Sequence, residues 1–461
     1  MRALIVVTVI GCGGTPAVKI PDWDKTLPEA SVLGSWRGLN PARGIIHLHS
    51  PYSHDACDGM PRDANGIPNE PCLADLRAGL CATKIDFAAL TDHDASMADE
   101  SFSTLFSMRS GDVAVMNTAN EQIASRMTCE DGHVVTFTVG SENETMPIML
   151  DRHVAGTVQQ RHDTYNASDA AAITAYHDAG GLAWFAHTES KTLDELHATV
   201  PDGIECYNLH ANLDPKIRPL LGLDPGGAIQ AAANFADTNP GHPEPDLALI
   251  SFLAPNEPAL NTWNTLLGEG RKLPATAGSD AHENALPITL ADGERGDSYR
   301  RVLRWFGNIV MVADPQDPAQ IKAALKAGRL YAVFEVMGTP EGLDIRATGS
   351  RTYELGDTAP SAEGATLTVD IPHVRNLDPS LPAPGVRARV IWIETPTGVV
   401  TELAKSAEGD AQLNVHIGAP GAYRVEITIV PSHLGPYLGD LGTDLAEVEL
   451  PWVYASPIYV Q

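Results

Sequence analysis

The sequence predicts an α/β fold followed by a smaller all-β domain. Up to about residue 337, short apolar runs alternate with helix-like segments, a pattern typical of a parallel sheet or barrel. From residue 338 onward, short alternating strands are separated by Pro, Gly and Asp turns, which is typical of a β-sandwich. The 461 residues are enough for two or three domains, and a hydrophobic share of 43% provides a sizeable core.

The first domain contains seven apolar runs that we expect to form buried strands. They span residues 44–49, 85–91, 113–119, 134–139, 182–187, 203–208 and 274–279. Helices are expected at 69–82, at 168–179 and at 317–327. The third is the clearest, because Asp317 caps its start, Pro318 occupies its first turn and Gly328 follows its end. A functional site of such a fold is expected at the carboxyl ends of the strands.

The second domain should consist of short strands alone. We expect them at 366–371, 389–395, 413–417, 423–430 and 446–452. No flexible linker rich in Gly and Ser precedes this domain, so the sandwich should pack firmly on the first domain as structural support.

The first twelve residues indicate export. One Arg precedes an apolar run of about nine residues that is too short to span a bilayer. The segment resembles a bacterial lipoprotein signal, in which cleavage before Cys12 leaves that cysteine to carry a lipid; the alternative is a plain secretory signal with Cys12 incidental. Residues 13–43 would then be a tether and lead-in. We expect an exported lipoprotein that faces the periplasm or the cell exterior and contacts the membrane only through its N-terminal lipid.

The cysteines fit an oxidising compartment. Without Cys12, five cysteines remain, so at least one should be unpaired. Cys57 and Cys72 bracket a polar loop that contains Pro and Gly and would not pack by itself, which makes them the first choice for a disulfide. No Cys-x-x-Cys pattern is present, which argues against a zinc ribbon or a thioredoxin-type site.

The charge balance excludes one class of partner. The 31 basic and 59 acidic residues give a net charge of −28, which repels an extended nucleic acid. A small molecule is the expected partner, and the oligomeric state is left open.

Two pairs of polar residues stand on expected strands. His47 and His49 lie two apart, so both imidazoles project from one face of the strand, and Asp280 and His282 repeat this spacing at the end of another strand. Further candidates at or beside strand ends are His93, Glu121, His133 and His187. Imidazole and carboxylate groups are the usual ligands of Zn, Mn and Fe, so these eight residues predict a ring of metal ligands. Isolated histidines receive no role: His177, His197, His210, His373 and His416.

The chain resembles the PHP (polymerase and histidinol phosphatase) metallohydrolase family, including its carbamate- and aryl-ester-hydrolysing relatives. The resemblance rests on HLHS, LTDHD, a Glu followed by GHV, AGGLAWFAH and GSDAH, in this order. It implies a distorted (β/α)7 TIM-like barrel of PHP type over 44–337, the β-sandwich over 338–461, and two or three divalent ions.

The resemblance also implies how the ligands are shared. The first ion would be held by His47, His49, Glu121 and Asp280, and Glu121 would bridge to a second ion bound by His133 and His187. The third would be held by His93, His282 and a residue of the first loop. His54 and Asp55 both qualify for that last place, with Asp58 close behind, and we choose Asp55. Glu142 and Glu144 are rivals of Glu121, which we prefer for its interval to His133.

The implied reaction is hydrolysis by a metal-bound hydroxide. His282 or His187 would pass a proton to the leaving group, and Asp280 would help to deprotonate the water. The sequence contains no Gly-x-Ser-x-Gly elbow, P-loop, His-Glu-x-x-His or Rossmann fingerprint, which argues against the other common hydrolase and nucleotide-binding classes.

Phosphoesters are the leading substrate class. Arg152, His153, Arg161 and Lys191 lie in the right part of the chain to meet a phosphate, although solvated surface charge also explains them. The alternatives are a carboxylic or carbamate aryl-ester hydrolase that uses the same metals, and a non-catalytic, surface-anchored binding lipoprotein.

Overall fold

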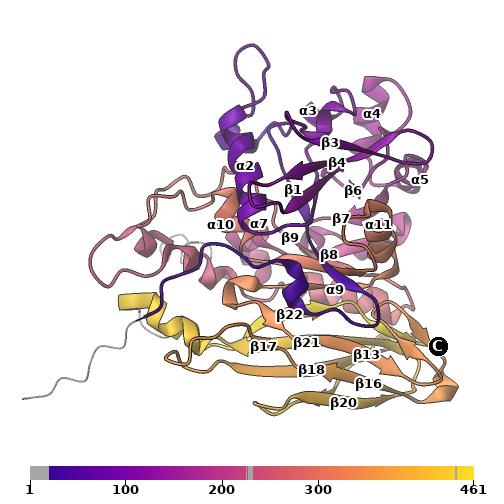
Figure 1. The fold of residues 1–461 in the computed structure, drawn as a ribbon. Coiled ribbons are helices and arrows are strands. Elements are labelled where there is room, and N and C mark those ends of the chain that lie inside the picture. The colour runs from indigo at the N-terminus through magenta and orange to yellow at the C-terminus, as the bar shows by residue number, and fades with distance from the viewer. Residues whose placement is uncertain (1–19, 225, 227–231, 442–443) are drawn as a thin grey trace, which may run out of the picture.

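The computed structural model describes residues 20–224, 226, 232–441 and 444–461 (Figure 1). The signal segment and Cys12 lie outside these ranges, as does the first part of the predicted tether. From Trp23 onward the lead-in packs on the fold, since the Trp23 indole donates to buried Asp246 over 2.8 Å. Within the described ranges, no helix has both the length and the apolarity needed to cross a membrane.

A large mixed sheet runs through the whole molecule. In its N-terminal part, β1 (Asn40–Leu48), β2 (Phe87–Leu90) and β5 (Val134–Val139) are parallel neighbours. The hairpin of β3 (Val113–Met116) and β4 (Gln122–Thr128) extends one side. On the other side β10 (Gly307–Val312) and β11 (Leu330–Val333) add antiparallel strands. The hairpin strand β3 is mostly exposed, which corrects the expected buried strand at 113–119 and follows from its place at the sheet edge.

A four-stranded sheet faces this part of the fold. Its strands are β6 (Met146–Ile148), β7 (Leu182–Phe185), β8 (Gly203–Asn208) and β9 (Ala275–Gly278), of which the last three are parallel. Single bridges link the two sheets, Leu48 to Ala281 and Val139 to Leu150. The α/β class is therefore as expected, whereas the described strands do not close into the predicted barrel.

Helices cover these sheets. The long ones are α2 (Glu70–Ala82), α4 (Val158–Tyr165), α5 (Ala170–Asp178), α9 (Glu257–Gly268) and α11 (Pro318–Ala327). Shorter ones are α1 (Ala56–Gly59), α3 (Asp94–Met97), α6 (Leu193–Thr199), α7 (Leu209–Leu213) and α10 (Tyr299–Leu303). The helix α11 begins and ends as its caps predict, since Asp317 accepts a hydrogen bond from the Ala319 amide and Gly328 is left-handed.

The C-terminal strands continue the large sheet. The strand β22 (Leu450–Ala455) pairs with β11, and beyond it follow β21 (Gly421–Val430), β18 (Gly385–Glu394), β19 (Val400–Lys405), β23 (Ile458–Val460) and β15 (Thr358–Ala359). A second layer contains β13 (Asp344–Thr348), β14 (Thr352–Tyr353), β16 (Ala365–Asp370) and β20 (Gln412–Ile417), and β12 (Pro340–Glu341) pairs with β17 (His373–Val374). The all-β part thus shares a sheet with the first domain.

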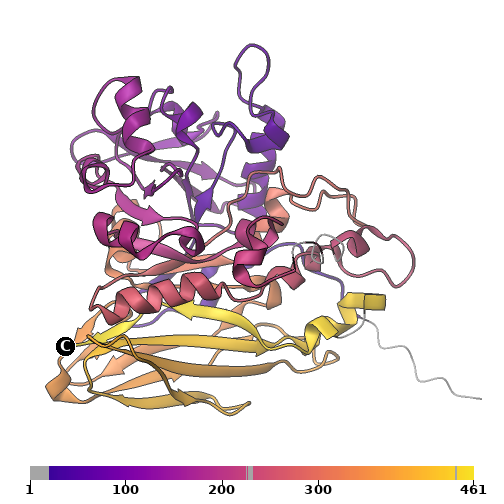
Figure 2. The same ribbon diagram turned by 180° about the vertical axis from the view of Figure 1, so that it is seen from behind.

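The helix α9 fills the space between the two parts (Figures 1 and 2). It contacts β8 on one side and β18 and β21 on the other. Its Trp263 is completely buried, and the Arg424 guanidinium lies 4.6 Å from the ring centroid. A buried aromatic ring removes a large apolar area from water. The helix α9 therefore joins the four-stranded sheet to the C-terminal strands.

The described part of the chain contains two disulfides. Cys57 pairs with Cys72, the pair that the loop composition favours, and Cys81 pairs with Cys129. Among the described cysteines Cys206 is free and buried, in line with the odd count.

Candidate metal centre

Six parallel strands end at one place. The residues just beyond or at the carboxyl ends of β1, β2, β5, β7, β8 and β9 form a cluster, together with one residue from the loop after β1. Its members are His47, His49, Asp55, His93, Glu142, His187, His210, Asp280 and His282. The strand alternation explains the start of the cluster, because it places His47 and His49 on the same face of β1.

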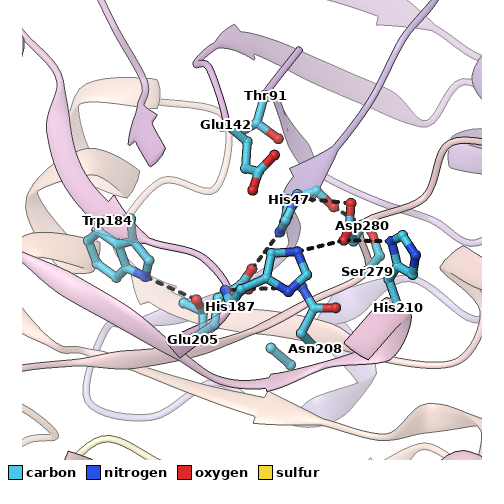
Figure 3. Close-up of polar contacts among 12 residues, drawn as sticks. His47, Thr91, Glu142, Trp184, His187, Glu205, Asn208, His210, Ser279 and Asp280 are labelled. Carbon is cyan, nitrogen blue, oxygen red and sulfur yellow. Dashed lines mark hydrogen bonds and ion pairs between the residues drawn. The ribbon is translucent and has the colours of Figure 1, made fainter. Parts of the chain in front are cut away.

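Asp280 lies at the centre of one half of the cluster (Figure 3). Its Oδ1 atom is 3.2 Å from His47 Nε2 and 3.3 Å from His49 Nε2. Its Oδ2 atom is 3.0 Å from His187 Nε2 and 3.0 Å from His210 Nδ1. One buried carboxylate therefore faces imidazoles from three other strands.

Asp55 takes the corresponding place in the other half. Its Oδ2 atom lies 3.4 Å from His93 Nε2 and 3.2 Å from His282 Nε2. The imidazole of His282 stacks on that of His49, with ring centroids 3.9 Å apart, so the two halves are in contact. His54 is exposed, and its ring centroid lies 5.2 Å from that of His93. The structure thus places Asp55, and not His54, among the converging ligand atoms.

Glu142 connects the two halves. It follows β5 by three residues and is buried. Its carboxylate can share an ion with His47 and His49, because one ligand atom of each lies within 4.8 Å of the others. The Glu142 Oε2 atom is also 3.1 Å from His93 Nδ1.

Hydrogen bonds orient four of the imidazoles in the same way. The Nδ1–H groups donate to oxygen atoms outside the converging set: His47 to Glu205 Oε1 over 2.8 Å, His93 to the Glu142 carbonyl over 2.5 Å, His187 to Glu189 Oε1 over 3.0 Å and His282 to the Asp280 carbonyl over 2.6 Å. In the neutral imidazole, each Nε2 atom then presents a lone pair to the cluster. Histidines that bind metals are held in this way by a carboxylate or a carbonyl.

The donor set fits divalent cations. Imidazole nitrogens and carboxylate oxygens face one another at 3.0 to 3.4 Å, as at His187 with Asp280 and at His93 with Asp55. The buried Nε2 atom of His282 forms no hydrogen bond with any described residue. Within the cluster, three groups of ligand atoms lie close enough to hold an ion: His49, Asp55, His93 and His282; His47, His49 and Glu142; and His210, Asp280 and His282. A fourth group, Glu29, Asp86 and His133, lies at the opposite ends of the strands.

The carboxylates of the cluster favour the binding of a cation. Burial lowers the pKa of His47, but the carboxylates of Asp280 and Glu205 outweigh it and hold that pKa well above the usual range. Burial also lowers the pKa of His93, yet Asp55 and Glu142 raise it to about 9. Protons and metal ions therefore compete for the same nitrogens, which is the usual behaviour of histidine ligands.

Unusual backbone accompanies the ligands. His187 has φ 49° and Asp280 has φ 51°, both in the left-handed region that non-glycine residues rarely adopt. Each such residue costs about 1–3 kcal/mol and persists only where its surroundings hold it, which is common at functional sites.

Two predicted ligands lie elsewhere and are corrected here. Glu121 belongs to the turn of the β3–β4 hairpin, where it is part-exposed and pairs with Arg152 over 3.1 Å. His133 lies at the amino end of β5, opposite the cluster, and contacts Glu29 and the Ile85 carbonyl. The interval between Glu121 and His133 suggested a motif, but the hairpin places one residue at the sheet edge and the other at the wrong strand end.

Glu142 and His210 occupy the cluster instead. Glu142 was a rival of Glu121 in the sequence, and its place just after a predicted strand could have decided the choice. His210 received no role, although it follows the strand at 203–208 by two residues, as His187 follows β7. The position after each strand was the signal that identifies both.

Comparison with known proteins gives limited similarity. No family model and no curated protein matches this chain. A two-domain protein from Bacteroides vulgatus, described as containing a predicted PHP-like metal-dependent phosphoesterase, is 12% identical with a TM-score of 0.33, over 94% of this chain and 99% of its own. PsfC from Pseudomonas syringae is 12% identical with a TM-score of 0.31, over 59% of this chain and 82% of its own. The first description names the family that the motifs resemble. These scores are too low to transfer a function, so the function is inferred from the site.

Proposed function

We propose that this chain is a metal-dependent hydrolase that cleaves phosphoesters at a centre of two or three divalent ions, with Zn, Mn or Fe as the candidates. The observation that carries the proposal is the shared orientation of His47, His93, His187 and His282, whose Nδ1–H groups donate outward while their Nε2 atoms face Asp280 and Asp55. Histidines that only pack in a core are not expected to converge with this common orientation.

Bound divalent ions would lower the pKa of water to roughly 7 and offset negative charge on the reacting group. The protein residues supply the surroundings. Asp280 has a side chain only 3% exposed, and it reaches His47 and His187 from one carboxylate. It is therefore placed to accept a proton within the centre.

Accessible imidazoles suit the transfer of a proton to a leaving group. The side chains of His187 and His210 are 22% and 33% exposed, whereas that of His282 is only 4% exposed. This contrast favours His187 over His282 as the general acid and adds His210 as a second candidate.

The choice of ester is the open part of the proposal. Three of the four residues suggested as phosphate contacts already have partners: Arg152 pairs with Glu121, Lys191 pairs with Glu144, and His153 hydrogen-bonds Tyr165 and the Glu100 carbonyl. The fourth, Arg161, has an Nε atom that forms no hydrogen bond with a described residue, so it stays a candidate contact. A phosphate would then be held chiefly by the ions. Because three of these side chains already have partners, the site is equally compatible with the second candidate, hydrolysis of a carboxylic or carbamate aryl ester at the same centre.

One experiment tests both candidates. Protein purified without chelator is analysed for bound metal and then assayed on chromogenic phosphate monoesters, diesters and triesters and on aryl esters. We expect two or three ions per chain and chelator-sensitive turnover of a phosphoester. Turnover of aryl esters alone would favour the second candidate. A metal content below one ion per chain in active protein would contradict the proposal, and a metal-loaded protein without turnover would favour the binding lipoprotein.

We further propose that the protein is exported and anchored through Cys12. The support is indirect: the two disulfides are of a kind that persists in oxidising compartments. Lipid labelling of wild type and of Cys12→Ser in a bacterial host tests this, since only the wild type should incorporate the label.

A further inference from the structure

A buried carboxylate of β8 lies directly behind the ligands, and its role is not explained by the proposed function alone. Glu205 is 1% exposed. Its Oε1 atom accepts the His47 Nδ1–H over 2.8 Å, and its Oε2 atom accepts the His187 amide over 3.1 Å and the Asn208 side-chain amide over 3.0 Å. Figure 3 shows these residues around Glu205.

Each of these contacts acts on a different ligand. The bond to His47 fixes its tautomer and directs Nε2 toward Asp280. The bond to the His187 amide holds a residue whose φ of 49° needs outside support. These two ligands come from β1 and β7, which belong to different sheets, and Glu205 is hydrogen-bonded to both.

The third contact reaches His210 through a helix cap. Asn208 caps α7, because its Oδ1 atom accepts the Ala211 amide over 2.9 Å. The second residue of that helix is His210. Since Glu205 accepts the Asn208 Nδ2–H, it orients the side chain that fixes the start of α7.

The neighbouring strand leaves space for this carboxylate. A Cβ atom on Gly278 of β9 would lie 2.0 Å from Glu205 Oε1. The φ of Gly278 is not in the left-handed region, so the lack of a side chain is required by the contact and not by the backbone.

We propose that Glu205 is a positioning residue that fixes His47, His187 and His210 for the ions they would share with Asp280. The inference rests on the proposed metal centre. Glu205 does not contact the group around Asp55, so its loss should weaken one part of the centre and spare the ion held by His49, Asp55, His93 and His282.

The test compares two buried carboxylates in the full chain. Glu205→Gln keeps the size of the side chain but replaces one acceptor by an NH2 group that meets N–H donors. Glu335→Gln is the control, because Glu335 is also 1% exposed and hydrogen-bonds Arg43 on the opposite side of the fold. Each protein is loaded with Zn²⁺, dialysed against graded chelator, and analysed for bound zinc and for folding by circular dichroism.

We expect Glu205→Gln to hold part of its zinc about 10- to 100-fold more weakly than wild type. Glu335→Gln should lower the melting temperature and keep the wild-type zinc affinity. Gly278→Ala is the second variant, since it keeps the carboxylate in the chain but displaces it, and it should reproduce the loss if Glu205→Gln does not fold.

Wild-type zinc affinity in both Glu205→Gln and Gly278→Ala would overturn this inference and leave the proposed function intact. A wild-type protein that binds no divalent metal would overturn the proposed function, and the inference with it.

Discussion

Both ends of the same parallel strands carry histidine beside carboxylates, and the two clusters differ in the groups that face those carboxylates. At the amino ends of β2 and β5, His133 Nδ1 contacts Glu29 over 2.9 Å and His133 Nε2 contacts the Ile85 carbonyl over 2.9 Å. The Lys84 ammonium lies 3.0 Å from Glu29, and the Arg43 amide donates to Asp86 over 2.7 Å. The oxygens there already face N–H groups.

At the carboxyl ends, imidazoles face the carboxylate. The Nδ1–H groups of His47 and His187 are donated to Glu205 and Glu189, and their Nε2 atoms face Asp280. No lysine or arginine takes part in the ion pairs of Asp280 or Asp55 within the described chain. Residue type alone does not separate the clusters. What separates them among the described residues is that Lys84 and the Arg43 amide face the carboxylates at the amino ends, whereas only imidazoles face Asp280 and Asp55, and a cation can replace the protons of those imidazoles.

The largest expected effect is on the rate. Asp280→Asn keeps the shape of the side chain but removes a charge that five imidazoles face, so turnover should fall roughly a hundredfold or more with the fold intact. Asp86→Asn at the amino ends should leave turnover within twofold of wild type. Near-normal turnover of the Asp280 variant would mean that the two clusters are not functionally different.

The two disulfides allow a comparison, because Cys57–Cys72 lies near the centre and Cys81–Cys129 lies away from it. Breaking Cys57–Cys72 or Cys81–Cys129 by double serine substitution should cost about 3 and about 4 kcal/mol by the loop-closure relation, for separations of 15 and 48 residues. Only the first should also weaken metal binding, because the Cys57 amide donates to the His282 carbonyl and Asp55 lies two residues earlier.

Urea unfolding and zinc retention at a fixed chelator concentration measure the two effects separately. Equal loss of zinc from both double variants would show that stability, and not the position of Asp55, controls retention.

Stability should depend on pH through the amino-end cluster. Burial raises the pKa of Asp86 to about 6, above its ordinary value of 3.8. The folded state then binds more protons than the unfolded state between these values, so this group lowers stability as pH rises from about 4 to about 6, by about 3 kcal/mol in total.

The difference in unfolding free energy between wild type and Asp86→Asn isolates that contribution. As pH rises from about 4 to about 6, the unfolding free energy of Asp86→Asn should increase relative to that of wild type. A shift in the opposite direction would indicate a bound cation that depresses the pKa of Asp86, and would remove the contrast between the clusters.

The smallest effect is expected at His133. His133→Ala removes two hydrogen bonds, each contributing about 0.5–1.5 kcal/mol, so the free energy of unfolding should fall by about 1–3 kcal/mol. Metal content should not change. Loss of an ion from a folded His133→Ala protein would restore the sequence-based assignment of this residue.

The sequence predicts local structure well where capping and periodicity agree. The helix α11 starts and ends at its predicted caps, and β5 and β8 match their expected bounds. The sheet arrangement was not predictable in the same way. The pairing of β22 with β11 joins segments more than a hundred residues apart, and no local pattern encodes such a register.

In the site, too, the residues with a local pattern were predictable and those placed by long-range contacts were not. His47 with His49 and Asp280 with His282 were found because their spacing fixes a common face. The interval to His133 favours Glu121 over Glu142, but an interval along the chain does not imply proximity, and the β3–β4 hairpin places Glu121 at the sheet edge. Glu205 lies inside an apolar run, and only the three-dimensional contact with His47 reveals its place.

Anomalous diffraction from crystals of protein purified without chelator tests the central claim most directly. We expect peaks for divalent ions among His47, His49 and Glu142 and among His49, Asp55, His93 and His282, and none between Glu29, Asp86 and His133. Active protein with no peak at the carboxyl ends of the strands, or with its only peak at the amino ends, would contradict the account.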